Sequence, residues 1–180
     1  MVDEIILDRP RVVTQDPRTC WAAAFESWAD ADAAMNGTTN SRDMNQLISD
    51  FDRWGMTRGD RLTLGGMRLL ASLGMMRMRE HHPGRLTPTK FSEMLTEFGY
   101  LYLAVYGHLI NNVRRGHALV CYGVDNSRIF VMDPWPGHGY RQIPSSHFVQ
   151  SNGTRVFVGT SLTTALSRSI EQSFSVLLQD

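Results

Sequence analysis

The chain lacks the features that define several large classes of protein. Its 180 residues contain two cysteines, Cys20 and Cys121, so it is not a disulfide-rich scaffold, and we expect both thiols to be reduced. Eighteen basic and eighteen acidic residues balance, which gives no indication of a nucleic acid or an anionic membrane as the main partner. There is no glycine-rich phosphate loop, no dinucleotide-binding motif and no apolar run long enough to span a membrane.

The N-terminus is not typical of a secretory signal peptide, because Asp3 and Glu4 precede a short apolar stretch, residues 5–7. We therefore expect a cytoplasmic protein, or one that a dedicated secretion system exports into a host or competitor cell. Lysine is almost missing, since Lys90 is the one lysine among the basic residues. Codon bias in a GC-rich genome explains this, and the alternative is a toxin that avoids lysine modification inside a foreign host.

Helical patterns fill the first part of the chain. Trp21, Ala24, Phe25 and Trp28 recur at i, i+3, i+4 and i+7, which predicts a helix from about Cys20 to Met35. Further helices are expected after an N-cap at Ser41, over residues 66–73, and between Thr87-Pro88 and Gly99.

Strand patterns follow Gly99. Short segments that are partly aromatic and β-branched predict strands over residues 100–106, 117–124, 128–132, 139–143 and 155–159. Helices followed by antiparallel strands indicate an α+β fold. We expect a single domain over residues 1–180, with a helical lobe at about 15–99, a sheet lobe at about 100–160 and a tail or helix at 161–180.

A candidate nucleophile lies at the start of the first predicted helix, in the sequence Gln15-Asp16-Pro17-Arg18-Thr19-Cys20-Trp21. Free backbone N–H groups and the positive end of the helix dipole favour a thiolate at Cys20. Asp16-Pro17 is typical of a turn, which would let the amide of Gln15 fold back toward the sulfur. Two alternatives remain open: Cys20 is a buried or incidental cysteine, and Gln15 is a surface glutamine.

A candidate base and a residue to orient it come later in the chain. His117 begins a predicted strand, and Asp133 follows sixteen residues further on, before Pro134-Trp135. A cysteine nucleophile needs a base, and the base needs a group that holds its ring. One hairpin would return Asp133 to the side of His117, where Trp135 would shield their contact from water.

Each of these residues also has a purely structural interpretation. His117 could be a histidine satisfied on a strand, Asp133 a turn acid, and Trp135 a core tryptophan. The orienting role could instead fall to His108, His138 or His147. Cys121 is expected to be a buried strand cysteine of low reactivity.

Segments 15–28 and 100–136 resemble the papain-like cysteine proteases, in the compact bacterial branch that includes effector proteases of plant pathogens and peptidases that process bacteriocin leaders. The resemblance implies a papain-like α+β fold with a cleft between two lobes. It also implies Cys20 as nucleophile, His117 as base, Asp133 as orienting residue and Gln15 as oxyanion-hole donor.

The sequence departs from papain at three points. Gln15 lies five residues before Cys20, one fewer than in papain, and Thr19 stands where a glycine is common. The third residue is Asp133, whereas papain has an asparagine and the bacterial branch usually has an aspartate.

We therefore expect a cysteine peptidase that hydrolyses peptide bonds, as a bacterial effector, a toxin or a peptide-maturation enzyme. The same residues could instead support peptidoglycan amide hydrolysis, glutamine deamidation or acyl transfer, or the fold could be a non-catalytic binding domain. No cofactor is expected, and no metal, because His81 and His82 lack further ligands at suitable spacing. The expected partner is a protein or peptide substrate and not a nucleic acid, with a host target or a cognate inhibitor protein as further candidates.

Overall fold

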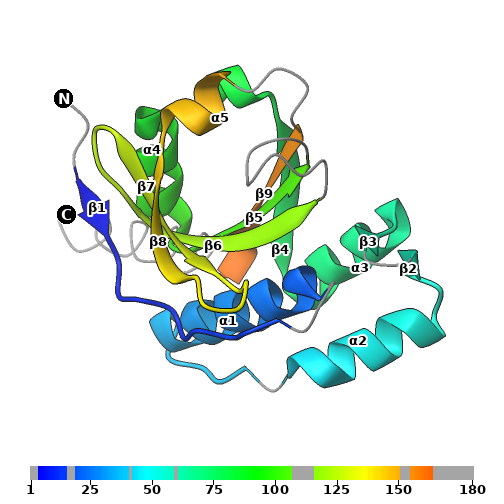
Figure 1. Cartoon of the computed structure of the whole chain (residues 1–180). Coiled ribbons are helices and arrows are strands. Elements are labelled where there is room, and N and C mark those ends of the chain that lie inside the picture. The colour runs from blue at the N-terminus through cyan, green and yellow to red at the C-terminus, as the bar shows by residue number, and fades with distance from the viewer. Residues whose placement is uncertain are drawn as a thin grey trace, which may run out of the picture.

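The computed structural model describes residues 4–15, 19–40, 42–58, 61–106, 116–150 and 155–163 of the chain. The helix expected in the tail, the turn at Asp16-Pro17 and His108 lie outside these residues. The elements, shown in Figure 1, are β1 Ile5–Ile6, α1 Cys20–Met35, α2 Met44–Arg53, β2 Thr57–Arg58, β3 Arg61–Leu62, α3 Leu64–Leu73, β4 Met76–His81, the 3₁₀ turn η1 Pro83–Arg85, α4 Pro88–Phe98, β5 Leu101–Tyr106, β6 His117–Val124, β7 Arg128–Asp133, β8 Gly139–Pro144, α5 Ser146–Gln150 and β9 Arg155–Ser161.

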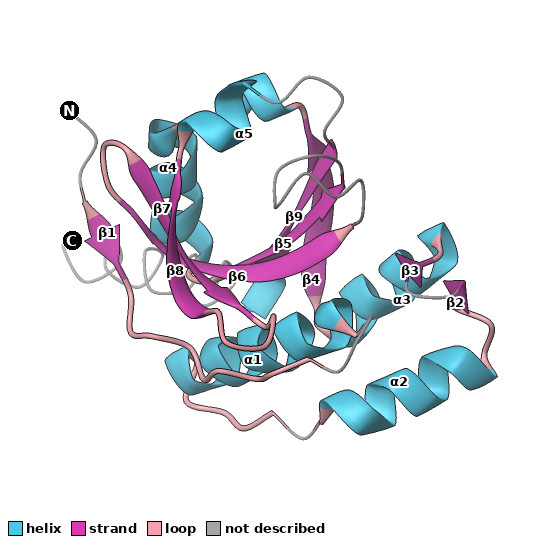
Figure 2. Ribbon diagram, in the orientation of Figure 1, coloured by secondary structure: helices cyan, strands magenta, loops and turns pink. Residues whose placement is uncertain are grey.

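In the described part of the chain, seven strands form one antiparallel sheet. Its order is β4-β9-β5-β6-β7-β8, and β1 pairs with β6 in addition. β2 and β3 form a separate hairpin. Figure 2 shows the sheet curving above α1, α2 and α3. The expected α+β fold is therefore confirmed.

Strand β4 was not indicated by the sequence pattern. It follows α3 in the helical half of the chain, yet it pairs with β9 at the edge of the sheet. Its sequence MRMREH carries three charged residues, Arg77, Arg79 and Glu80, which are all exposed. Charged side chains are typical of an edge strand, where they discourage pairing with another molecule, and they hide the apolar alternation of a strand.

Helix α1 is buried on nearly all sides. The sequence indicated one apolar face, but every residue from Trp21 to Trp28 is buried. The sheet covers the helix on one side, α2 packs on another, and the N-terminal segment crosses it. Three consecutive alanines, residues 22–24, leave room for these neighbours to approach closely.

The sheet separates two apolar cores. Alternate residues of β6 point to opposite faces, as in any strand. The core between the sheet and α1 contains Ala118, Val120 and Tyr122. The core between the sheet and the helices α4 and α5 contains Leu119 and Cys121. The sheet is thus fixed from both faces, and the first residue of α1 lies beside the first residue of β6.

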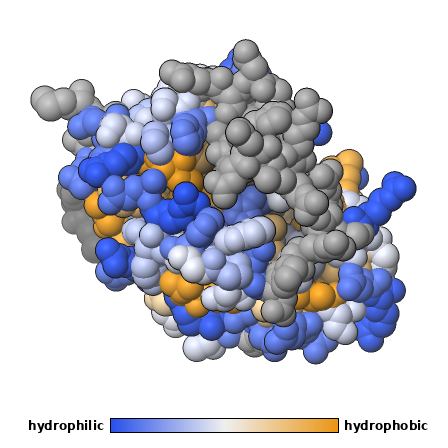
Figure 3. Space-filling view, in the orientation of Figure 1, coloured by the Kyte–Doolittle hydropathy of each residue, from blue (hydrophilic) through white to orange (hydrophobic). Residues whose placement is uncertain are grey.

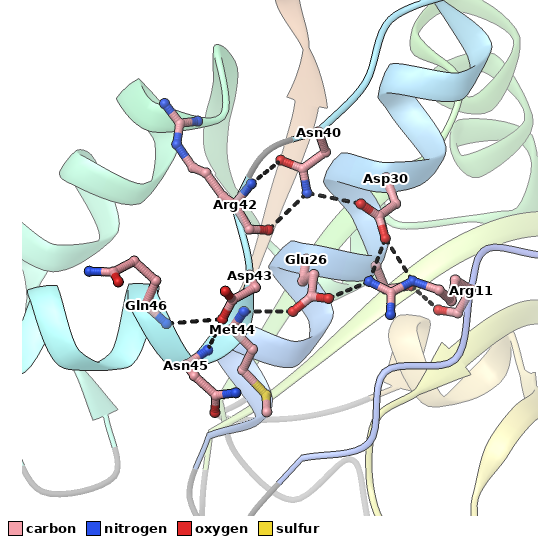
Figure 4. Close-up of polar contacts among 10 residues, drawn as sticks. Arg11, Glu26, Asp30, Asn40, Arg42, Asp43, Met44, Asn45 and Gln46 are labelled. Atoms are coloured by element: carbon pink, nitrogen blue, oxygen red, sulfur yellow. Dashed lines mark hydrogen bonds and ion pairs between the residues drawn. The ribbon is translucent and has the colours of Figure 1, made fainter.

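A polar network holds the N-terminal segment to α1 (Figure 4). The guanidinium of Arg11 donates to Glu26 and, at 2.8 Å, to Asp30, while Ser27 Oγ donates to the carbonyl of Arg11 at 2.6 Å. The second carboxylate oxygen of Glu26 accepts the N–H of Met44 at 2.6 Å, which ties the start of α2 to the same point. This network fixes the path of the chain that leads to Gln15.

The N-cap of α2 is Asp43 and not Ser41. Its side-chain oxygen Oδ1 accepts the N–H groups of Asn45 at 2.8 Å and of Gln46 at 3.1 Å. Both residues are good N-caps, and the contact of Met44 with Glu26 of α1 sets where the helix begins.

The face of the molecule in Figure 3 is mainly hydrophilic, with separate apolar areas. None of the helices in the described ranges is both long and apolar enough to cross a membrane.

Candidate active site

Cys20 is the first residue of α1. The N-cap is Thr19, whose carbonyl oxygen accepts the N–H groups of Ala22 at 3.0 Å and Ala23 at 3.1 Å. The side chain of Thr19 makes no capping hydrogen bond to the helix. The thiol of Cys20 is partly exposed and lies at the positive end of the helix dipole.

The hairpin β6–β7 brings His117 and Asp133 together. Val120 pairs with Met132, and extending this register by one residue puts Leu119 opposite Asp133. His117 lies two residues before Leu119, so it is the diagonal neighbour of Asp133 on the same side of the sheet. His117 Nε2 lies 2.7 Å from Asp133 Oδ1. This contact leaves Nδ1 as the ring nitrogen for the thiol of Cys20, which lines the same pocket as His117.

The surroundings of His117 favour its charged form. Burial by itself lowers the pKa of His117, but hydrogen bonds with Asp133 and Cys20, together with the charge of Asp133, outweigh burial and raise this pKa to about 9. An imidazolium at neutral pH is the partner that stabilises a cysteine thiolate.

The carboxylate of Asp133 is fully buried. Burial alone would raise the pKa of this carboxyl, but the hydrogen bond and charge of His117, the N–H of Trp135 and the ring of His138 hold it well below its usual range. Asp133 therefore stays ionised although its side chain is shielded from water.

Gln15 is 4% exposed, so the interpretation as a surface glutamine is wrong. Its backbone N–H donates to the carbonyl oxygen of Pro134 at 2.9 Å, which places Gln15 beside the end of β7. Its side-chain oxygen Oε1 is buried without a hydrogen-bond partner among the residues described. A buried polar atom without a partner costs about 1–3 kcal/mol.

Trp135 is 51% exposed, so the interpretation as a core tryptophan is wrong. Its ring meets the ring of His117 edge to face, with 6.2 Å between the centroids, and lies 6.3 Å from the ring of His138. The side chain of His117 is 12% exposed beside it. The contact agrees with the expected role of Trp135 as a cover for the His117 ring.

Cys20 and His117 line one small pocket, with a cavity volume of about 30 Å³. Most of its lining is apolar and comes from α1, α3, β5 and the residues around His117. Gly116 lets the backbone pass close to Tyr106 in the pocket lining, because a Cβ there would lie 2.9 Å from the ring of Tyr106. The sequence pattern did not single out the wall residues, which are Leu62, Met67, Leu70, Met78, Tyr102 and Tyr106. Their apolar spacing predicts buried faces, but it does not say which faces border a cleft.

His138 contacts Asp133 and does not replace it, as its Nδ1 lies 2.9 Å from Asp133 Oδ2. The sequence offered no signal for this contact beyond the presence of a histidine in the turn after β7. No group of three or more His, Cys, Asp or Glu side chains within the described ranges could hold a metal ion.

A partly exposed thiol at a helix start, facing a histidine and a buried aspartate on an antiparallel sheet, is the arrangement of the papain-like cysteine peptidases. A family model described as papain-like cysteine protease AvrRpt2 matches residues 4–153. The chain belongs to this family, and the protein is a cysteine peptidase.

Solved structures support the fold. The peptidase domain of Streptococcus ComA, a bi-functional ABC transporter, is 20% identical with a TM-score of 0.56, over 84% of this chain and 98% of that domain. A putative C39-like peptidase from Bacillus anthracis is 14% identical with a TM-score of 0.53, over 88% and 98%. A double glycine motif protease from an AMS/PCAT transporter, in complex with the leader peptide, is 16% identical with a TM-score of 0.50, over 88% and 99%. Among curated proteins the chain has no match.

Proposed function

We propose that Cys20, His117, Asp133 and Gln15 carry out peptide-bond hydrolysis, with Cys20 as nucleophile, His117 as acid and base, Asp133 as orienting residue and Gln15 as oxyanion-hole donor. The observation that carries this proposal is that His117, which lines one pocket with Cys20, lies 2.7 Å from the buried carboxylate of Asp133. These parts match the needs of a thiol nucleophile: a base within reach and a group that holds the base.

Acylation begins when Cys20 Sγ attacks the carbonyl carbon of the substrate. The oxygen gains negative charge, which the backbone N–H of Cys20 and the side-chain amide of Gln15 stabilise. The imidazolium of His117 gives its proton to the leaving nitrogen as the C–N bond breaks. The products of this step are a free amine and a thioester at Cys20.

Deacylation uses the same groups in reverse. His117, now neutral, removes a proton from a water molecule, which attacks the thioester carbon. Cys20 leaves as a thiolate and the new carboxylate product departs. Asp133 holds the ring of His117 in one orientation through both steps, so that one nitrogen always faces the sulfur.

The substrate in this proposal is a protein or peptide with an apolar side chain close to the scissile bond, because the lining of the pocket beside Cys20 is largely apolar. The biological role would be that of a bacterial effector or toxin that a secretion system delivers to a host target. The resemblance to effector proteases and the membership of the AvrRpt2 family support this role.

A second setting is peptide maturation, which the leader-peptide complex of one structural neighbour suggests through the shared fold. Deamidation of glutamine, peptidoglycan amide hydrolysis and acyl transfer would use the same thioester. They differ in the leaving group and in the molecule that accepts the acyl group.

Mass spectrometry of a host-cell lysate separates peptide-bond hydrolysis from glutamine deamidation. The purified protein and its Cys20→Ala variant are incubated with the lysate, and new peptide N-termini and converted glutamines are counted. If the reaction is hydrolysis, new N-termini appear in the lysate treated with the parent protein and not in the lysate treated with Cys20→Ala. Conversion of glutamine to glutamate without new N-termini would make the site a deamidase, and no change in either would contradict the proposal.

A further inference from the structure

We propose that His138 and Arg141 are positioning residues, which hold the carboxylate of Asp133 on the side opposite to His117. This inference rests on the proposed function, since it concerns how Asp133 orients the base. Neither residue contacts the pocket that Cys20 lines, so neither is a candidate catalytic group.

The contacts of Asp133 divide evenly between its two oxygens. Oδ1 lies 2.7 Å from His117 Nε2 and accepts the backbone N–H of Trp135 at 2.9 Å. Oδ2 lies 2.9 Å from His138 Nδ1 and accepts from Arg141 Nη1 at 3.1 Å. Protein donors thus satisfy both oxygens of a carboxylate whose side chain is 0% exposed.

The local sequence explains why His138 reaches this point. Residues 135–138 form a tight turn in which the N–H of His138 donates to the carbonyl of Trp135 at 2.9 Å. Pro136 and Gly137, with φ of 81° at Gly137, are the residue types that a type II turn requires. The turn folds the ring of His138 back over the end of β7.

Arg141 reaches Asp133 through the register of β8. Asp133 pairs with Gly139, and Val131 pairs with Arg141, so Arg141 is the diagonal neighbour of Asp133 on the same face. His117 holds the equivalent diagonal position on β6. The buried carboxylate is therefore held between cationic or donor side chains from the strands on both sides.

The contacts also assign the proton of His138. A carboxylate can only accept, so His138 must carry a proton on Nδ1 to bind Oδ2. Arg141 Nη1 lies 3.2 Å from His138 Nδ1. A protonated Nδ1 has no lone pair to accept a hydrogen bond, so Arg141 must donate to Asp133 Oδ2. Together the two donors fix the plane of the carboxylate and aim Oδ1 at His117.

The proposal is tested by pairs of variants of the full-length protein. His138→Leu removes the donor, whereas His138→Asn keeps an amide N–H near the position of Nδ1. Arg141→Met removes the charge and donor, whereas Arg141→Lys keeps both. Arg128→Met is the matched control, because Arg128 is an arginine of the same sheet that binds Asp125 and Gln142 instead.

Two readouts are used: the rate at which iodoacetamide alkylates Cys20 at neutral pH, and the NMR shift of the proton on His117 Nε2. We expect alkylation to fall about tenfold in His138→Leu and Arg141→Met, the effect of one lost hydrogen bond to a charged group. The proton on Nε2 should move upfield in the same two variants. His138→Asn, Arg141→Lys and Arg128→Met should stay within about threefold of the parent rate.

Parent rates and shifts in folded His138→Leu and Arg141→Met variants would overturn the proposal. If these variants do not fold, the proposal is tested on the parent protein by the nitrogen NMR shift of His138 Nδ1. The proposal requires the shift of a protonated nitrogen. An unprotonated Nδ1 would also overturn it. These readouts need no substrate, so they are independent of whether Cys20→Ala abolishes peptide cleavage, which is the test of the proposed function.

Discussion

The two cysteines of this chain have the same side chain in opposite surroundings. Cys20 begins α1, is partly exposed and shares a pocket with His117. Cys121 lies inside β6, fully buried in the core beneath α4. Burial raises the pKa of the Cys121 thiol to about 12, and the thiol donates to the carbonyl of Gly123 at 3.6 Å. Position in the fold, rather than residue type, separates a candidate nucleophile from an inert core residue.

The largest effect is expected when each cysteine is removed in turn. Cys20→Ala should reduce peptide cleavage by about 10⁴–10⁶-fold, because no thioester can form. Cys121→Ala should keep its activity and lose roughly 1–2 kcal/mol of unfolding free energy, because it leaves a small cavity in the core. Cleavage assays with denaturant unfolding measure both quantities. Equal activity of the two variants would abolish the distinction between the two cysteines.

Gln15→Ala should slow turnover by about 10²–10³-fold, the usual effect of losing one oxyanion-hole donor. Alkylation of Cys20 should stay unchanged, because Gln15 stabilises charge on the substrate and not on the sulfur. Turnover and alkylation are measured on the same preparation. Unchanged turnover would show that Gln15 is not an oxyanion-hole donor. The shorter spacing of five residues between Gln15 and Cys20 would then have moved its amide away from the hole.

Asp133→Ala should lose about 10²-fold in turnover, because His117 loses the group that orients its ring. Asp133→Asn should retain more, since its amide oxygen can still accept from His117. Its amide N–H would face His138 Nδ1, which can become an acceptor by changing tautomer. Turnover of both variants is compared on one substrate, with circular dichroism to check folding. If Asp133→Ala works as well as the parent, Asp133 is a turn residue only.

The sequence predicted the elements that carry the candidate residues better than the contacts between distant segments. The bounds of α1 and β6 agree with the expected ranges, since periodic apolar residues and the flanking turns mark them. The predicted strands begin and end within two residues of the observed ones. These features are local, and local patterns carry them. The assignment of one domain over residues 1–180 stays a prediction, as the family model ends at residue 153.

Other features depend on pairing between distant segments, which no local pattern shows. The charges of β4 hide a strand that only its partner β9 defines. The burial of Gln15 depends on the contact with Pro134, more than one hundred residues away in the sequence. The position of Arg141 beside Asp133 follows from the register of β8, which its spacing from Asp133 alone does not reveal.

The pH dependence of stability gives a smaller effect. The pKa of His117 is raised to about 9 in the folded protein, so its stabilising contribution is complete below about pH 6.5 and is lost as the pH rises through about 9. Unfolding free energy should therefore decrease over this window, by on the order of 3 kcal/mol. Denaturant unfolding from pH 6 to pH 10 measures the slope. The slope should flatten in His117→Ala, and an equal slope in that variant would assign it to other groups.

The most direct test compares the alkylation of the two cysteines in the folded protein. Iodoacetamide is added at several pH values, and mass spectrometry of the peptides gives a separate rate for Cys20 and for Cys121. The account predicts that near neutral pH Cys20 reacts at least about a hundredfold faster than Cys121, and that His117→Ala removes most of this advantage. Equal rates for the two cysteines, or a rate for Cys20 that His117→Ala leaves unchanged, would contradict the claim that Cys20 is a nucleophile activated by His117.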